Sequence, residues 1–262
     1  MNLILRIWRS SLGKKYIMAI TGAGMIAFVA GHLIGNLQIF LGADAINKYA
    51  YFLQHNKPLL YVARLSMIAM VTLHFLSAFQ LWRDNVDARP MDYANGKTPF
   101  GADLASRTMV LGGVIIATFV IYHLLHYTVR LEGASLGAGS FVTDPMFKEI
   151  TKEGVERHDV FAMMVAGFQR PLVALFYMVG VGLLCLHLSH GIAAMFQSLG
   201  LKNHVYGPLI DKLAKVVAVA LFLGYVSIPG SILVCKYGDS YLQAKKNPNP
   251  IKAVLVPGKE TR

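Results

Sequence analysis

Five long runs of apolar residues divide the chain, and each run is bounded by charged residues, glycine or proline. Each is about as long as the roughly 20 residues that a helix needs to cross a bilayer. The runs lack the period-two alternation that is typical of outer-membrane barrel strands. The pattern therefore predicts an all-α integral membrane protein, a single domain over residues 1–262, with spans at about 16–40, 59–82, 107–129, 171–196 and 213–235.

Composition and charge support a membrane protein. Hydrophobic residues make up 55% of the chain and charged residues 15%, against about 25% charged in soluble domains. The net charge of +11 lies mainly in tails and connections that flank the apolar runs. We therefore expect contacts with anionic lipid and with a partner surface rather than with nucleic acid. Arg6, Arg9, Lys14 and Lys15 precede the first span, which predicts a cytoplasmic N-terminus.

Two cysteines, Cys185 and Cys235, lie inside apolar runs and form no CxxC or CxxCH pattern. A zinc ribbon, a cysteine-ligated cluster and a covalently attached c-type haem therefore lack their ligands.

Histidines are the unusual polar residues of the spans. A histidine at membrane depth is costly, so it normally faces the interior of a bundle and has a partner or a function. His55, His158 and His204 lie in connections, where a solvated residue is the ordinary expectation. The other six of the nine histidines lie in the apolar runs: His32, His74, His123, His126, His187 and His190.

Four of these histidines lie at matched positions. His32, His123 and His187 each come 16 residues after the start of their span, and His74 comes 15 residues after. At 1.5 Å per residue, each lies about 23 Å along its helix. Because successive spans run in opposite directions, we expect His32 and His123 near the outer leaflet and His74 and His187 near the inner leaflet.

Two histidines at each of two levels predict two stacked haems b, each held by two imidazoles. Bis-histidine iron is six-coordinate and suited to electron transfer, and helical bundles commonly hold cofactors between facing helices. Small residues near these histidines would leave room for a porphyrin: Gly24, Gly31, Gly35, Gly180, Gly191 and Ala194.

Simpler explanations exist for each feature taken alone. One histidine can hydrogen-bond across helices, and glycines often serve close helix packing. A proton relay or a haem-free transporter is a further alternative, but no span carries Asp or Glu near its middle, and no inverted repeat is visible.

Several segments resemble the cytochrome b subunit of succinate dehydrogenases and fumarate reductases, of the two-haem, single-anchor type. They are GHLIGNLQIFLG at 31–42, RLSMIAMVTLHFLSAFQLWRDNVDAR at 64–89, IYHLLHYT at 121–128 and HLSHGIAAMFQSLG at 187–200. The resemblance covers the first four spans well, whereas the fifth span and the C-terminal tail are less distinctive.

The resemblance implies an enzyme subunit that anchors two partners in the bacterial cytoplasmic membrane. One partner would be an FAD flavoprotein, on which succinate and fumarate interconvert, and the other an iron–sulfur protein. The anchor would exchange electrons with a quinone, commonly menaquinone. The resemblance also implies that His32 and His123 hold the distal haem, and His74 and His187 the proximal one.

Two ligand choices stay open. His126 follows His123 by three residues, and His190 follows His187 in the same way. Depth favours His123 and His187, which leaves His126 and His190 for haem propionates, quinone or simple packing.

The quinone site is harder to place. Relatives of this type can use an acid in the connection between the first two spans, but here the only acid is Asp44, placed like a helix cap. Gln54 and His55 lie near the expected position of that acid. Arg64 is a candidate for a propionate contact or for an ordinary interfacial anchor. The anchor of a hydrogenase or a formate dehydrogenase remains an alternative function.

Overall fold

The fold is a bundle of five long apolar helices. A computed structural model describes residues 6, 8–88, 108–151 and 154–247. Five helical segments are apolar and long enough to cross a membrane, the third of them when it is counted through Val129, which confirms the all-α prediction and the five predicted spans. The helices are α2 (Ser11–Leu37), α4 (Lys57–Asp87), α6 (Met109–His123), α8 (Pro171–Ser198) and α9 (Gly207–Cys235).

Short irregular turns extend two of the spans. A 3₁₀ turn, η1 (Gln38–Leu41), continues α2, and a π-helical segment, η2 (Leu124–Val129), continues α6. A π-helical turn changes the direction in which the following side chains point, and such turns are frequent at functional sites. The change of helix type falls directly after His123.

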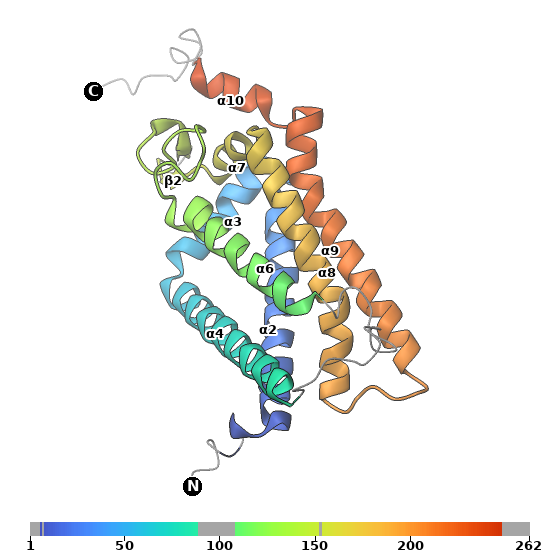
Figure 1. Ribbon diagram of the computed structural model, residues 1–262. Coiled ribbons are helices and arrows are strands. Elements are labelled where there is room, and N and C mark those ends of the chain that lie inside the picture. The colour runs from blue at the N-terminus through green and yellow to red at the C-terminus, as the bar shows by residue number, and fades with distance from the viewer. Residues whose placement is uncertain (1–5, 7, 89–107, 152–153, 248–262) are drawn as a thin grey trace, which may run out of the picture.

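The helices α2, α6 and α9 pack around α8, and α4 lies on the outside against α2 (Figure 1). Glycine permits the closest approaches. A Cβ atom at Gly180 of α8 would lie 2.4 Å from the Phe119 ring of α6, and one at Gly224 of α9 would lie 2.7 Å from Leu33 of α2. These two glycines therefore allow α8 to approach α6 closely and α9 to approach α2 closely.

A cap closes the end of the bundle opposite the N-terminus (Figure 1). We define the cap as α3 (Ala43–His55), the segment 130–159, α7 (Val160–Phe168) and α10 (Asp239–Lys246). The segment contains a 3₁₀ turn, η3 (Pro145–Phe147), and two short antiparallel strands, β1 (Lys148–Ile150) and β2 (Glu156–His158). Residues 161–168 of α7 are all buried, so the cap is built around this short helix.

Buried polar groups tie the cap together. Asn47 of α3 is fully buried and donates from Nδ2 to Glu149 (2.8 Å) and to Asp159 (3.0 Å). Its Oδ1 accepts from the backbone N–H of Phe161 at 3.0 Å. One amide therefore connects α3, β1 and the start of α7.

Asp159 is the centre of this network. It caps α7 by accepting from the N–H of Ala162 and also accepts from Tyr241 and Lys245 of α10. Burial alone would raise its pKa, but these hydrogen bonds outweigh burial and hold the pKa below its usual value. The carboxylate thus stays charged although it is fully buried.

Two further titratable groups of the cap respond to their surroundings. Hydrogen bonds from Arg157 and Lys48 lower the pKa of Asp44. Burial lowers the pKa of His158 to about 4, and repulsion by Arg130 acts in the same direction. The expectation that His158 is a solvated loop residue is therefore wrong, because its ring is half-buried next to the Met163 sulfur.

Candidate functional site

His32 and His123 lie together inside the bundle, near the cap. Their ring centroids are 5.8 Å apart, and the ring planes make an angle of 78°. Phe28 stacks on His32 at 5.5 Å, and Tyr225 of α9 lies 6.4 Å from it. Phe119 stacks on His123 at 6.3 Å. Aromatic side chains from three helices thus enclose this pair, which we call the cap-side pair.

His74 of α4 is oriented by the backbone of α2. Its Nδ1 lies 3.1 Å from the carbonyl oxygen of Met18 and 3.2 Å from the Thr21 hydroxyl. Because a carbonyl only accepts, Nδ1 carries the proton and Nε2 keeps its lone pair. A ring N–H held by a backbone carbonyl is the arrangement that typically fixes a metal-binding histidine.

His187 of α8 lies within electrostatic range of His74 of α4, and His190 also interacts with His187. Within the described residues, the buried Nδ1 of His187 has no hydrogen-bond partner. We call His74 and His187 the second pair.

The two pairs occupy different depths. The His74 ring packs on α2 at Gly22, where a Cβ atom would lie 3.4 Å from it. Gly22 precedes His32 by ten residues, so the pairs lie about 15 Å apart along α2.

A cavity adjoins one member of the second pair, His187. A cavity of about 180 Å³ lies beside His187 and is lined by Thr108, Met109, Leu111, Gly112, Ile115, Leu183 and Leu186. α4 packs on α2 and not closely on α8.

The glycines near the histidines have two different roles. Nothing lies within 4 Å of a Cβ atom built at Gly31 or Gly191, so these positions border open space. Cβ atoms at Gly24 and Gly35 would meet Met70 and Tyr49, and Gly180 lies against Phe119. For these three glycines, room for a cofactor is the wrong interpretation, because neighbouring helices fill the space.

Two imidazoles do not complete the coordination of a metal ion, so the paired histidines suit a metal whose other ligands belong to a cofactor. Metal–imidazole bonds of about 2 Å and ring radii of about 1 Å separate the centroids of two axial histidines by roughly 6 Å. The cap-side pair, at 5.8 Å, matches this separation. Among the residues that the structure describes, no three His, Cys, Asp or Glu side chains gather around one point. The spacing of the cap-side pair is therefore compatible with two imidazoles on one haem iron.

His126 lies among the rings of Tyr127, Phe141 and Tyr177 and is not a member of the cap-side pair. It is fully buried, and its Nδ1 lies 3.0 Å from the Tyr177 hydroxyl. Its ring lies 4.0 Å from Tyr127 and 5.4 Å from Phe141. In the described part of the chain, its Nε2 and the Tyr127 hydroxyl are both buried without a hydrogen-bond partner. His123, not His126, is the α6 histidine that faces His32.

The remaining predicted contact residues do not gather at one place. Gln54 and His55 are exposed at the end of α3, and the His55 ring stacks on Tyr51 at 3.7 Å. Arg64 is exposed on α4. Neither of the two described cavities is lined by these residues or by His190.

The geometry defines a class: a five-helix membrane bundle that holds two pairs of histidines at two depths. No protein-family model, no curated protein and no solved structure matches this chain.

Proposed function

We propose that the chain is the membrane cytochrome b subunit of a succinate:quinone oxidoreductase and holds two haems b. The observation that carries the proposal is the pairing of histidines from different helices at two levels of one apolar bundle. His32 and His123 would hold the distal haem, and His74 and His187 the proximal haem. Each haem supplies reversible one-electron transfer at a six-coordinate iron.

The protein's own contribution is to orient the imidazoles and to exclude water. The Met18 carbonyl fixes the His74 tautomer so that Nε2 faces away from α2. Phe28, Phe119 and Tyr225 surround the cap-side pair with apolar surface. A dry, rigid site of this kind favours electron transfer over ligand exchange.

Partners complete the proposed enzyme. Succinate and fumarate would interconvert on an FAD flavoprotein, and an iron–sulfur protein would pass electrons to or from the second pair. The complex would lie in the bacterial cytoplasmic membrane with the N-terminus cytoplasmic, as the basic residues before the first span suggest. This assignment of partners rests on the sequence resemblance.

The quinone, for which menaquinone is our choice, would exchange electrons with one of the haems. His126 is the best-supported candidate contact, because its unpartnered Nε2 lies beside the cap-side pair. A buried, unsatisfied ring nitrogen is costly unless something binds it. His190, Arg64, Gln54 and His55 are weaker candidates, since they line neither of the two described cavities.

The test is reduction of the haems in the purified complex. Succinate should reduce a low-spin haem b spectrum, and added menaquinone should reoxidise it. A His74→Ala variant should keep about one haem per chain and lose most succinate-linked quinone reduction. His204→Ala, which changes a histidine in a connection, is the matched control and should behave like the unchanged protein.

The rivals give different results. Reduction by hydrogen or formate, but not by succinate, would assign the chain to another respiratory dehydrogenase. A purified chain without visible absorption would favour a haem-free transporter.

A further inference from the structure

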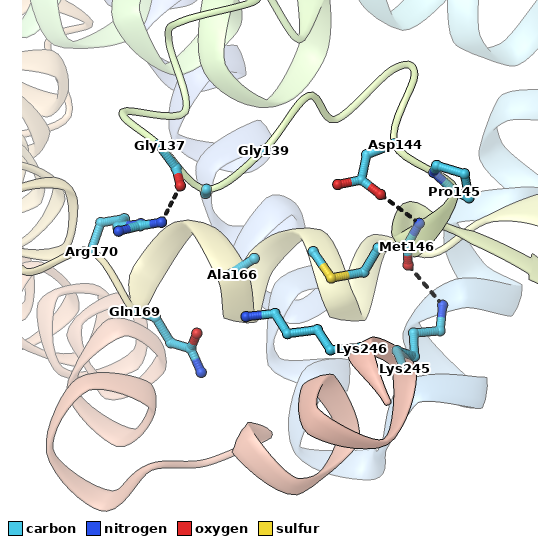
Figure 2. A pocket seen from close by; sticks show the side chains of 11 residues that line it. Gly137, Gly139, Asp144, Pro145, Met146, Ala166, Gln169, Arg170, Lys245 and Lys246 are labelled. Carbon is cyan, nitrogen blue, oxygen red and sulfur yellow. Dashed lines mark hydrogen bonds between the residues drawn. The ribbon is translucent and has the colours of Figure 1, made fainter. Parts of the chain in front are cut away.

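A second cavity lies in the cap, away from the histidine pairs. Its volume is about 640 Å³. Figure 2 shows Arg170 and Gln169 at one end, Asp144, Pro145 and Met146 at the other, and Lys245 and Lys246 along one side. The backbone of Gly137 and Gly139 completes the wall.

The charge of the lining is positive. Three cationic side chains face one carboxylate, that of Asp144. The Asp144 carboxylate already accepts a hydrogen bond from the Met146 N–H at 2.9 Å. Lys245 is neutralised by Asp159 and also bonds the carbonyl oxygens of Met146 and Lys148. Asp144 keeps its negative charge, because a backbone N–H does not neutralise it, so the lining stays positive only by the excess of Arg170 and Lys246 over this one carboxylate.

Both groups can bind an anion. Arg170 donates from one nitrogen to the Gly137 carbonyl oxygen, which leaves other N–H groups of its guanidinium fork available. Lys246 is exposed and forms none of the ion pairs found among the described residues. A guanidinium beside an ammonium is the combination that binds phosphate groups, the arginine in a bidentate manner.

The position of the cavity favours a lipid over a free phosphate. Arg170 directly precedes α8, so the cavity lies where a span leaves the apolar part of the membrane. Pro145, Met146 and Ala166 add apolar surface to the lining. Below Arg170, α8 carries an exposed apolar ridge at helical spacing, formed by Leu172, Leu175, Phe176 and Val179. Acyl chains can lie along this ridge while the headgroup occupies the cavity.

We propose that this cavity is a binding site for an anionic phospholipid, with its phosphate between Arg170 and Lys246 and its acyl chains along α8. The site is independent of the haems. It would hold the 130–159 segment and α10 to the start of α8.

Native mass spectrometry of the delipidated full chain in detergent tests the proposal, with dioleoyl-phosphatidylglycerol as the probe. The chain should retain one lipid molecule at concentrations where dioleoyl-phosphatidylcholine does not bind. Arg170→Gln and Lys246→Gln should each weaken binding about fivefold, which corresponds to about 1 kcal/mol per cation. The double variant should lose more than tenfold.

Lys212→Gln combined with Lys215→Gln removes the same charge from exposed positions on α9 at the other end of the bundle. This control should bind the probe within twofold of the unchanged chain. If the control and the Arg170/Lys246 double variant weaken binding equally, the attraction is non-specific and the proposal fails. It also fails if inorganic phosphate displaces the lipid at millimolar concentration, since the site would then recognise free phosphate. If Arg170→Gln does not fold, Lys246→Glu still decides, because its side chain is exposed and its charge reversal should abolish retention.

Discussion

Asn47 joins three elements of the cap, so its removal should loosen the cap without disturbing the spans. Asn47→Ala deletes two hydrogen bonds to carboxylates, those of Asp159 and Glu149. It also leaves the buried N–H of Phe161 without its acceptor. Asp159 keeps its other donors, and Glu149 keeps its bond from Arg157, so neither carboxylate loses all its partners.

The expected cost follows from these contacts. An unsatisfied buried N–H costs about 1–3 kcal/mol, and a hydrogen bond to a charged group contributes about 1.5–3 kcal/mol. Since both carboxylates retain other partners, we expect less than the sum of these contributions, about 3 kcal/mol. That corresponds to a roughly 100-fold increase in the population of the open cap.

Hydrogen exchange of the peptide covering 156–168, measured by mass spectrometry on the purified chain, reports this opening. Exchange should accelerate roughly 100-fold in Asn47→Ala, while peptides from α8 stay unchanged. Lys48→Ala is the matched control, because Lys48 is exposed and pairs only with exposed Asp44, and such pairs contribute about 0.3–0.5 kcal/mol. Equal acceleration in both variants would refute the role assigned to Asn47.

Three further predictions concern pH, space and packing. The pKa of His158 is lowered to about 4, so the unfolded cap binds its proton more tightly than the folded cap. Cap stability should therefore be full above pH 6.5 and fall towards pH 4, by at most about 3 kcal/mol and by less because the ring is partly exposed. His158→Gln should flatten this dependence in the same exchange experiment, corrected for intrinsic rates. Gly31→Leu places a side chain in open space beside His32. It should leave the helical circular dichroism unchanged while the haem content falls to about one per chain. Gly230→Leu, which also enters open space but on α9, is the control and should keep both haems. Gly180→Leu must displace Phe119 and should lower thermal stability by about 1–3 kcal/mol or more; an unchanged melting temperature would contradict the packing described.

The spans and the histidine levels could be predicted because their signals are local. An apolar run of sufficient length predicts a span without knowledge of its neighbours. Counting residues along a helix of fixed rise gives the depth of a side chain. His32 and His123, whose ring centroids are 5.8 Å apart, come from the first and third spans, which their order along the chain already indicated to run in the same direction.

The cap could not be predicted in this way. Asn47 and Asp159 are 112 residues apart, and no periodic pattern connects them. The burial of residues 161–168 depends on α3 and α10, which the hydropathy pattern does not place. The run DVFAMMVAGF at 159–168 begins with Asp159, an N-cap residue type, and is continuously apolar. This is the one local signal for α7.

Glycine roles also depended on the partner helix. Gly31 and Gly35 lie one turn apart on α2, yet Gly31 borders open space and Gly35 lies against Tyr49. The sequence alone does not distinguish a glycine that leaves room for a ligand from one that admits a neighbouring side chain.

The central claim is that two histidine pairs hold two haems b. The most direct measurement is the haem content per chain of the purified protein, by pyridine haemochrome absorbance against protein concentration. The account predicts two haems b per chain with low-spin spectra, falling to one in His32→Ala and to one in His74→Ala. A chain without haem, or an unchanged content in both variants, would contradict it.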